Sequence, residues 1–396
     1  MVAHIVDLRL AQELKDFGAR DIDACFNCGN CTAVCRLSEG ASTFPRRLIR
    51  YGQLGMRDRL VSSKEMWLCW GCRDCSSTCP RQARPSEYVE AVRRYAIASY
   101  DRTTIARRLY TSGFFTAFFG LALAIVFALL LISGGGRMES HEFALFAFIP
   151  YELIHDLGIA VLAIMGLTAL LNTVTLLSRV VSAASGTAYS PIEGATAPIL
   201  ARVAHATREV LNELLAQRRF RSCEVDSSKP LMLRPWFVHY TITWGFVGLL
   251  AATGLDFLFK TPGSFVPLWY PTRLLGTISG LGLSYGLIVT MIRRSRPALS
   301  SQGLTDSTAS RLVPSDWLFL SLLLAVTLLG FVVEAAVYFP VGTAWGYVSF
   351  LVHIALAMEL LILFPFTKFA HALYRPVALW VLMVSQRTFS GPPGPS

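Results

Sequence analysis

Two cysteine runs constrain this chain more than any other feature of its sequence. The first run, C-x2-C-x2-C-x3-C, comprises Cys25, Cys28, Cys31 and Cys35; the second, with the same spacing, comprises Cys69, Cys72, Cys75 and Cys79, followed by Pro80. Three thiolates at this spacing on a tight loop can bind three iron atoms of one [4Fe-4S] cluster, while the fourth cysteine reaches a neighbouring cluster. In a pair of such runs, each run therefore supplies the fourth ligand of the cluster that the other run binds.

The interleaved spacing assigns four cysteines to each of two [4Fe-4S] clusters. One cluster is expected on Cys25, Cys28, Cys31 and Cys79, and the other on Cys69, Cys72, Cys75 and Cys35. Arg36 stands where the second run has Pro80, which leaves the geometry at Cys35 open. Zinc is the alternative, but zinc sites pair distant C-x2-C elements and have no use for a third cysteine three residues further on. A disulfide framework fits less well, because no secretory signal precedes the segment and it is expected on the cytoplasmic side of a membrane.

The composition of the chain indicates a membrane domain. Hydrophobic residues make up 53% of the 396 and charged residues only 16%, a balance too apolar for a soluble protein of this size. A membrane-spanning helix needs about 20 apolar residues. Six segments approach that length, at about 113–133, 149–177, 236–258, 272–292, 316–339 and 345–366.

The positions of Lys and Arg predict the orientation of these segments. Residues before the first segment contain 18 of them, the loop 178–235 contains 8, the loop between the fourth and fifth segments 4 and the tail 3, whereas the other three loops contain only Arg137, Lys260 and Arg273. Positive residues accumulate in cytoplasmic loops. We therefore expect a multi-pass protein of the inner (cytoplasmic) membrane with both termini and the cysteine runs in the cytoplasm. The net charge of +10 then needs no nucleic-acid partner.

The sequence divides into three predicted regions. Residues 1–112 form a polar, mostly helical domain for the two clusters, with helices at 6–17 and 85–100. Residues 113–388 form the membrane domain, including the inner loop 178–235, and the Gly- and Pro-rich tail 389–396 is expected to be disordered.

The inner loop contains a predicted amphipathic helix. Its apolar positions are Leu200, Val203, Thr207, Leu211 and Leu214, opposite Arg202, Arg208 and Arg218. This helix is expected on the lipid headgroups, with a place under the cluster domain as the alternative. The ninth cysteine, Cys223, is expected to have no redox role.

Four of the seven histidines lie in or at the ends of predicted membrane segments. A polar ring is costly to bury there, so such residues are usually functional. His353 and His371 are 18 residues apart. On one continuous helix this is five turns and about 27 Å, which would place both rings on one face, in opposite leaflets. His155, at the outer end of the second segment, and His239, at the inner end of the third, match these two depths.

Matched depths predict two pairs of histidine ligands. We expect His155 with His353 and His239 with His371, each pair holding one b-type haem. The alternative for each histidine is a buried ring hydrogen-bonded to a neighbouring helix. His141 is the reserve candidate for the outer site, and His4 and His205 are expected to be surface residues. The predicted fold is all-α, a helical two-cluster ferredoxin-like domain fused to a six-helix transmembrane cytochrome b bundle.

Two parts of the sequence resemble known modules. The segment 364–371, Phe-Pro-Phe-Thr-Lys-Phe-Ala-His, with His353 upstream, resembles the last helix of the gamma subunit of respiratory nitrate reductase and of the cytochrome b subunit of heterodisulfide reductase. The cysteine runs, with Trp67-Leu-Cys69-Trp-Gly-Cys72 between them, resemble the small iron–sulfur subunit of heterodisulfide reductase. A fusion of both in this order is similar to the C subunit of the quinone-interacting membrane-bound oxidoreductase (Qmo) complexes. In the nitrate reductase subunit the partner histidines lie on a single earlier helix, whereas His155 and His239 lie on two.

The resemblance implies an electron-transfer subunit of a quinone-dependent oxidoreductase. Its cofactors would be two b haems and two [4Fe-4S] clusters, with a quinone, expected to be menaquinone, as substrate. Its partners would be cytoplasmic flavin and iron–sulfur subunits like Qmo A and B, and adenylylsulfate reductase of sulfate metabolism. Two alternatives stand beside it: a fused membrane subunit of a heterodisulfide reductase complex, and a haem-free membrane-tethered iron–sulfur sensor or anchor. No residue is assigned a catalytic role, although the intramembrane carboxylates Glu152, Asp156, Glu334 and Glu359 are candidates to take protons.

Overall fold

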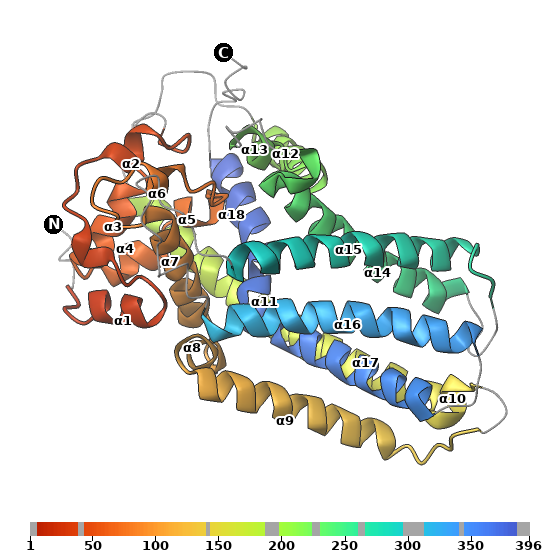
Figure 1. Cartoon of the computed structure of the whole chain (residues 1–396). Coiled ribbons are helices and arrows are strands. Elements are labelled where there is room, and N and C mark those ends of the chain that lie inside the picture. The colour runs from red at the N-terminus through yellow and green to blue at the C-terminus, as the bar shows by residue number, and fades with distance from the viewer. Residues whose placement is uncertain are drawn as a thin grey trace. The chain divides into compact units, whose positions relative to one another are not determined.

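The computed structural model describes residues 6–38, 43–139, 143–186, 198–223, 230–259, 266–295, 313–339 and 344–385. The regular secondary structure of these residues is entirely helical (Figure 1), which confirms the predicted all-α class. The chain forms two compact units. The first contains Met1–Arg107, Leu170–Val225 and Phe369–Ser396, and the second contains Arg108–Ala169 and Asp226–Lys368. His4, His141 and the tail 389–396 lie outside the described residues.

Helix α7 organises the cysteine-bearing part of the first unit. Its bounds, Pro85–Tyr100, are those predicted, because Pro85 is favourable in the first turn of a helix. Tyr88, Val92 and Tyr95 follow at helical spacing and are at most 2% exposed. Five short helices pack against α7: α1 (Leu10–Asp16), α3 (Arg46–Gln53), α4 (Arg57–Val61), α5 (Glu65–Leu68) and α6 (Asp74–Ser77). The remaining elements of this part are η1 (Ile22–Ala24), α2 (Asn30–Ala33) and α8 (Ile105–Thr111).

The first predicted helix, 6–17, is shorter than expected and begins at Leu10. Asp7 competes with a helical start, since its carboxylate accepts a hydrogen bond from the Arg9 backbone N–H at 2.9 Å. The Asp7 N–H donates to the Gly55 carbonyl, also at 2.9 Å. An aspartate that bonds the backbone two residues on forms a turn instead of a helix.

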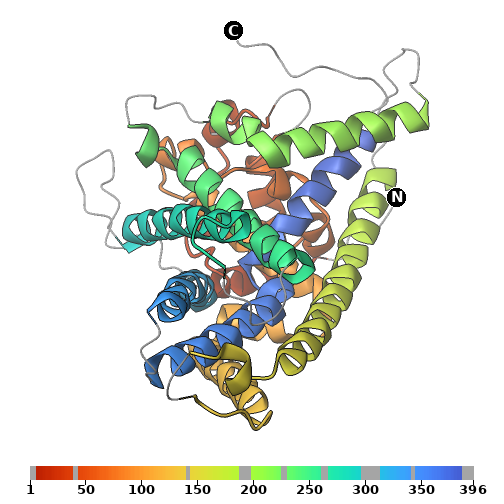
Figure 2. The same ribbon diagram turned by 90° about the vertical axis from the view of Figure 1, so that its right-hand side faces the viewer.

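Helix α18 (His371–Ser385) belongs to the first unit, together with α12 (Ile199–Ala216), α13 (Arg218–Cys223) and the last part of α11 (Tyr151–Gly186). It packs against α5 and crosses α12 (Figure 2). Tyr374 is fully buried, with its ring centroid 5.4 Å from that of Trp67 and 5.8 Å from that of Tyr100. The compact units therefore differ from the predicted boundaries at 112 and 388, because long-range packing groups α12 and α18 with the cysteine segment.

Helix α12 forms where the inner loop predicted it, but a different face is buried. Ala206, Val210 and Glu213 are its buried residues, while Leu200 is 77% exposed and Leu211 52% exposed. The buried face meets α18 and a cluster that includes Leu68 of α5. The packing is thus that of the predicted alternative, against the cysteine-bearing part, and the leucines selected from the sequence remain exposed.

In the part of the chain that the structure describes, six helices are long and apolar enough to cross a membrane, and they confirm the six predicted segments. They are α9 (Gly113–Ile132), α11 over Tyr151–Val181, α14 (Pro235–Phe259), α15 (Pro271–Ser295), α16 (Pro314–Tyr338) and the stretch Ala344–Phe366, which contains α17 (Ala344–Leu363). Within the second unit α14 packs on α15, α15 on α16, and α17 on both α16 and α9 (Figure 1). Between 17% and 39% of each apolar stretch is buried, which leaves apolar faces for lipid.

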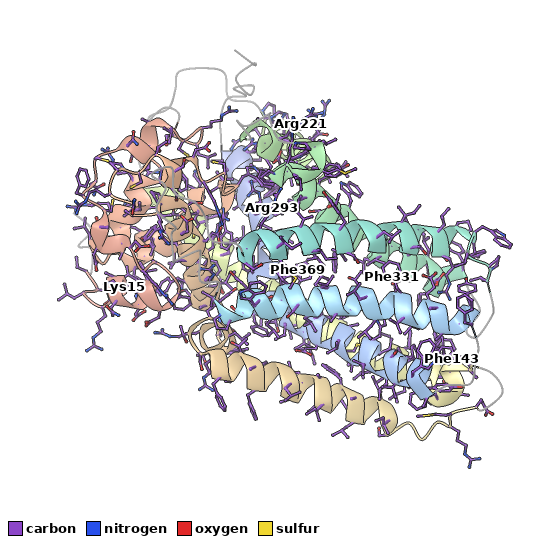
Figure 3. The ribbon with its side chains drawn as sticks, viewed as in Figure 1. Lys15, Phe143, Arg221, Arg293, Phe331 and Phe369 are labelled. Atoms are coloured by element: carbon purple, nitrogen blue, oxygen red, sulfur yellow. The ribbon has the colours of Figure 1, made fainter. Side chains whose placement is uncertain are left out.

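A buried tyrosine fixes the connection between α9 and α11. Tyr347 of α17 is 1% exposed, and its hydroxyl accepts hydrogen bonds from the backbone N–H groups of Glu139 and Ala144, each at 3.1 Å. The ring of Phe143 packs on it with centroids 4.9 Å apart (Figure 3). The short helix α10 (Leu145–Phe148) also contacts α17. These bonds satisfy backbone groups that would otherwise be unpaired near the apolar bundle.

The structure contradicts the expectation that His353 and His371 lie on one continuous helix. Helix α17 ends at Leu363 and is followed by η3 (Phe364–Phe366) and η4 (Lys368–Ala370), so that α18 begins only at His371. Thr367 between them is extended, with φ −109° and ψ 179°. Pro365 explains the break, because it has no N–H to donate and its ring collides with the preceding turn. The five-turn relation between the two histidines is therefore wrong.

Glycines allow α14 and α15 to approach at backbone contact. A Cβ on Gly245 would lie 2.7 Å from both the Leu283 nitrogen and the Ser279 carbonyl oxygen, and one on Gly286 would lie 3.0 Å from the Val238 oxygen. Small residues at such crossings are what permits close helix packing in membranes.

We expect Gly245→Val to lower the thermal stability of the detergent-solubilised protein strongly. Backbone atoms cannot move aside as a flexible side chain can, so the cost should exceed the ~1–3 kcal/mol typical of overpacking. Gly254→Val on the same helix is the matched control, because no described atom lies within 4 Å of a Cβ at that position. Equal melting temperatures for the two variants would contradict the close approach.

Candidate functional site

The two cysteine runs fold into the same backbone shape. Asn27 and Gly71, each two residues after the first cysteine of its run, have φ of 67° and 69°, and Gly29 and Arg73, two residues further, have φ of 91° and 72°. Left-handed residues at both places turn the chain sharply between successive cysteines. Glycine and asparagine adopt this conformation readily, whereas Arg73 is strained.

A short helix follows each turn and carries the third cysteine. Helix α2 holds Cys31 and α6 holds Cys75, each in its second position. The capping pattern is repeated as well, since the Gly29 carbonyl accepts from the N–H groups three and four residues on, as the Arg73 carbonyl does, at 2.9–3.1 Å. The two helices pack against each other, and the Asn30 side chain donates to the Thr78 carbonyl. This packing brings the end of each run to the start of the other.

The first group of sulfur atoms joins three cysteines of one run to the last cysteine of the other. Cys25, Cys28, Cys31 and Cys79 line one hollow together with Arg46 and Arg81. Burial raises the pKa of the Cys31 thiol, and the nearby Cys25, Cys28 and Cys79 add to the rise. These are the four residues that the spacing assigned to one cluster.

The second group has the complementary membership. Burial raises the pKa of the Cys75 thiol, and the neighbouring Cys69, Cys72 and Cys35 raise it further. The pKa of Cys35 is also raised by burial, with a smaller contribution from Cys69. Four thiols crowded in this way resist becoming thiolates unless a cation compensates their charge, and a bound metal centre supplies that compensation. The donor set in both groups therefore fits a cluster held by thiolates.

Backbone N–H groups donate to cysteine sulfur atoms in both groups. The Gly71 N–H donates to Cys69 Sγ and the Ala83 N–H to Cys79 Sγ, each at 3.4 Å. Such bonds are among the features that set the potentials of iron–sulfur clusters. Hydrogen bonds to cysteine sulfur stabilise the reduced cluster, because it carries one more negative charge than the oxidised cluster.

The eight cysteines of the two runs are free thiols, not disulfides. Within the described ranges, no three His, Cys, Asp or Glu side chains are placed to hold one metal ion. That finding concerns a single ion, whereas in a cubane each cysteine binds a different iron atom and the four sulfurs need not meet at one point.

His353 is hydrogen-bonded to a neighbouring helix, as the alternative to haem ligation expected, and the same bond leaves one ring nitrogen for a metal. Its Nδ1 lies 3.0 Å from the Val326 carbonyl oxygen of α16, and a hydrogen bond there leaves Nε2 as the electron-pair donor. Gly330, one turn along α16, gives the ring room, since a Cβ at that position would lie 3.4 Å from His353 Cε1. This donor fits a haem iron.

The other three histidines are not brought to His353 by a contact among the described residues. The ring of His155 stacks on Phe257 of α14, with centroids 5.4 Å apart and planes 10° apart, and its side chain is 35% exposed. His239 Nδ1 lies 3.5 Å from Thr243 Oγ1 on the same helix. His371 opens α18 and so belongs to the first unit, while His239 belongs to the second. The pairings of His155 with His353 and of His239 with His371 stay predictions.

Buried carboxyl groups also lie among the membrane helices. Glu359 is 2% exposed and faces Gly120 of α9, where a Cβ would lie 3.1 Å from its Oε1. Asp316, which the sequence did not single out, is 1% exposed and lies 3.8 Å from Lys368 Nζ. Glu334 accepts from the Thr277 hydroxyl at 3.3 Å, whereas Asp156 is 81% exposed.

Arg375 is a residue of this site that the sequence analysis missed. Its guanidinium donates to the carbonyl oxygens of Cys69 and Leu68, at 3.0 and 3.1 Å. In the sequence it counted only as one of the positive charges of the tail. A lone arginine amid the apolar residues of 371–380 is the signal that could have identified it, because such a charge needs a buried partner.

Comparison with known proteins supports the assignment of the cysteine segment. Residues 21–83 match the family model of a 4Fe-4S dicluster domain. The chain is 33% identical over 113 residues to a protein of Archaeoglobus profundus that is itself like the C subunit of heterodisulfide reductase; the match covers 27% of this chain and 60% of that protein. It is 29% identical over 91 residues to the C subunit of the H(2):CoB-CoM heterodisulfide,ferredoxin reductase of Methanothermobacter thermautotrophicus, which covers 23% of this chain and 49% of that protein.

A third relative is the C subunit of the ferredoxin:CoB-CoM heterodisulfide reductase of Methanosarcina acetivorans, 35% identical over 77 residues, 19% of this chain and 30% of that protein. The chain thus spans about half to three fifths of the first relatives it matches. No solved structure matches. The likeness confirms the predicted resemblance of the cysteine-bearing part to the heterodisulfide reductase small subunit. The resemblances to the nitrate reductase gamma subunit and to the Qmo membrane subunit stay predictions.

Proposed function

We propose that this chain is a membrane subunit of a quinone-dependent oxidoreductase of the Qmo type. It would carry electrons between membrane quinol, expected to be menaquinol, and cytoplasmic flavin and iron–sulfur subunits like Qmo A and B. Adenylylsulfate reductase of sulfate metabolism would be the final partner. The chain would lie in the inner (cytoplasmic) membrane with both termini in the cytoplasm, as its loop charges favour.

The observation that carries this proposal is the interleaving of the two cysteine groups in a chain that also has six membrane helices. Each group takes one cysteine from the other run, so the two clusters are expected to be close neighbours, as electron transfer between them requires. The likeness to the C subunits of heterodisulfide reductases supports the electron-transfer role for residues 21–83.

Different residues would bind the haems, accept protons and bind the clusters. Bound b haems would exchange single electrons with the quinone pool. His353 would hold one of them through Nε2, oriented by the Val326 carbonyl. A quinol also loses two protons, and the buried carboxyl groups of Glu359 and Asp316 are groups within the bundle able to accept them. The two cysteine groups would hold the clusters outside the apolar helices.

A second candidate is a fused membrane subunit of a heterodisulfide reductase complex. Its support is that all three relatives described above carry heterodisulfide reductase names, which support the first proposal equally. In that case the partner that reduces the disulfide would lie on another chain. Mass spectrometry of the complex purified from its native membrane separates the two: flavoprotein subunits of the A and B kind support Qmo, and a disulfide-reducing catalytic subunit supports the second candidate.

Quinol-driven reduction of the purified chain tests the proposal directly. Reduced menaquinone analogue added to the protein in lipid nanodiscs is expected to produce the absorption bands of reduced b haem and then the EPR signals of reduced clusters. Dithionite added to the same sample reduces all the haem and clusters and so gives the maximum signal of each. A sample with clusters but without a haem band, even under dithionite, would contradict the proposal and favour a haem-free iron–sulfur anchor.

A further inference from the structure

A guanidinium group is enclosed beside the second cysteine group. Arg375 lies on α18, and its two terminal nitrogens donate to the carbonyl oxygens of Cys69 and Leu68, at 3.0 and 3.1 Å. Its carbon Cζ lies 3.1 Å from the centre of the Trp70 ring. One carbonyl is that of the first cysteine of the second run, and the other is that of the residue before it. The positive charge therefore lies directly against the chain that supplies this group.

Aromatic rings pack against the partly buried side chain of Arg375. The Trp70 ring, which covers one side of the guanidinium, stacks on Phe220 with centroids 4.9 Å apart and planes 1° apart. Phe220 itself is only 8% exposed. The guanidinium is charged at neutral pH, and a partly buried charge acts more strongly than one in water.

A second arginine shares the same carbonyl. Arg93 of α7 donates to the Cys69 carbonyl and, at 2.7 Å, to that of Met66. Two guanidinium groups on one carbonyl concentrate positive charge at Cys69. Glu213 of α12 is the nearby acidic group, because it is among the charges that raise the pKa of Arg375. It is 8% exposed, and one of its carboxylate oxygens accepts from the Arg219 N–H at 3.1 Å.

The first cysteine group also has neighbouring cations, since Arg46 and Arg81 line its hollow. Arg46 is partly buried, as Arg375 is, whereas Arg81 is exposed with its guanidinium 5.9 Å from the Phe26 ring. Solvent and salt screen an exposed charge such as that of Arg81. Arg81 therefore offers an exposed cation with which Arg375 can be compared.

We propose that Arg375 is a positioning residue that makes the cluster assigned to Cys69, Cys72, Cys75 and Cys35 more easily reduced than it would be without this charge. One electron added to a cluster adds one negative charge, and a fixed, partly buried positive charge stabilises that product more than the oxidised state. Its bonds to the Cys69 and Leu68 carbonyls also hold α18 against this run. The inference rests on the cluster assignment in the proposed function, but not on haem or quinone.

A redox titration of single-site variants tests this inference. The purified full-length chain is titrated at pH 8 with dithionite as the reductant, and the EPR signal of the reduced clusters is followed. In Arg375→Gln, the reduced-to-oxidised ratio of one cluster at fixed potential is expected to fall about tenfold, equal to about 59 mV for a one-electron couple. The other cluster should titrate as in the unchanged protein.

Glu213→Gln supplies a test of opposite sign. Removing a negative charge beside Arg375 is expected to raise the same ratio, while a merely structural disturbance would not produce shifts of opposite direction in the two variants. Arg375→Lys keeps the positive charge, so the reduced-to-oxidised ratio of the cluster should stay close to that of the unchanged protein. Arg81→Gln is the matched control at the first cysteine group and should move neither cluster by more than about twofold.

The outcomes separate this inference from the proposed function. A Cys28→Ala background, which is expected to lack the first cluster, identifies the shifted signal as that of the second. Unchanged potentials in both Arg375→Gln and Glu213→Gln, with full iron content, would overturn the role of Arg375 and leave the clusters in place. If Arg375→Gln loses iron, the upward shift in Glu213→Gln still supports the charge effect, and its absence would overturn it. A chain without iron in its unchanged form would instead contradict the proposed function.

Discussion

Removing Cys79 is expected to abolish the cluster that it shares with the first three cysteines of the first run. Cys79 belongs by sequence to the second run, but it lines the hollow with Cys25, Cys28 and Cys31. Cys79→Ala and Cys28→Ala should therefore each lower the iron content by about half, because each removes one ligand of the same [4Fe-4S] cluster. Iron analysis together with EPR of the reduced protein measures this loss.

Double variants distinguish the interleaved arrangement from one in which each run holds its own cluster. With interleaving, Cys28→Ala combined with Cys79→Ala loses one cluster, whereas Cys28→Ala combined with Cys35→Ala loses both. With separate runs the two results are exchanged, and that exchange would refute the interleaving. Cys223→Ala is the control, since this residue lies outside both runs and should leave the iron content unchanged.

Replacing His353 is expected to remove one of two haems. Its Nδ1 contact with the Val326 carbonyl orients the ring and leaves Nε2 for iron, and no aliphatic side chain can take that place. His353→Leu should therefore lose about half of the haem, measured by the absorbance of the reduced pyridine complex per mole of protein.

Two controls accompany the His353 measurement. His205→Gln changes an exposed histidine on α12 and should keep the haem content. The EPR signals of the iron–sulfur clusters should persist in His353→Leu, because the cysteines belong to the other compact unit. Full haem content in His353→Leu would show that this histidine is not a ligand.

Features fixed by local spacing could be predicted from the sequence. The turn geometry of the cysteine runs repeats at matching positions, Asn27 with Gly71 and Gly29 with Arg73. It follows from intervals of three residues, which act over a single loop. The six candidate membrane helices among the described residues also agree with their predicted bounds to within a few residues, apart from the extension of α11 to Gly186. The length and hydropathy of a span are properties of consecutive residues.

Features that depend on distant partners could not be predicted. The periodicity of 200–214 marked Leu200 and Leu211 as the packing face, whereas Ala206 and Val210 are buried. A hydrophobic face shows that a helix is amphipathic, but it does not show which neighbour it meets. The spacing of His353 and His371 predicted one continuous helix. In the structure Pro365 and the extended Thr367 separate the two helices that carry these histidines.

The sequence by itself determined that this chain has two sets of cluster-forming cysteines and six apolar helices, because both depend on the order of adjacent residues. Only the tertiary structure decided that α18 packs against α5 and brings Arg375 to the carbonyl of Cys69. These residues are 306 positions apart, and no local pattern relates them. They meet because Tyr374, the neighbour of Arg375, is buried between Trp67 and Tyr100, and the burial of these rings stabilises the contact.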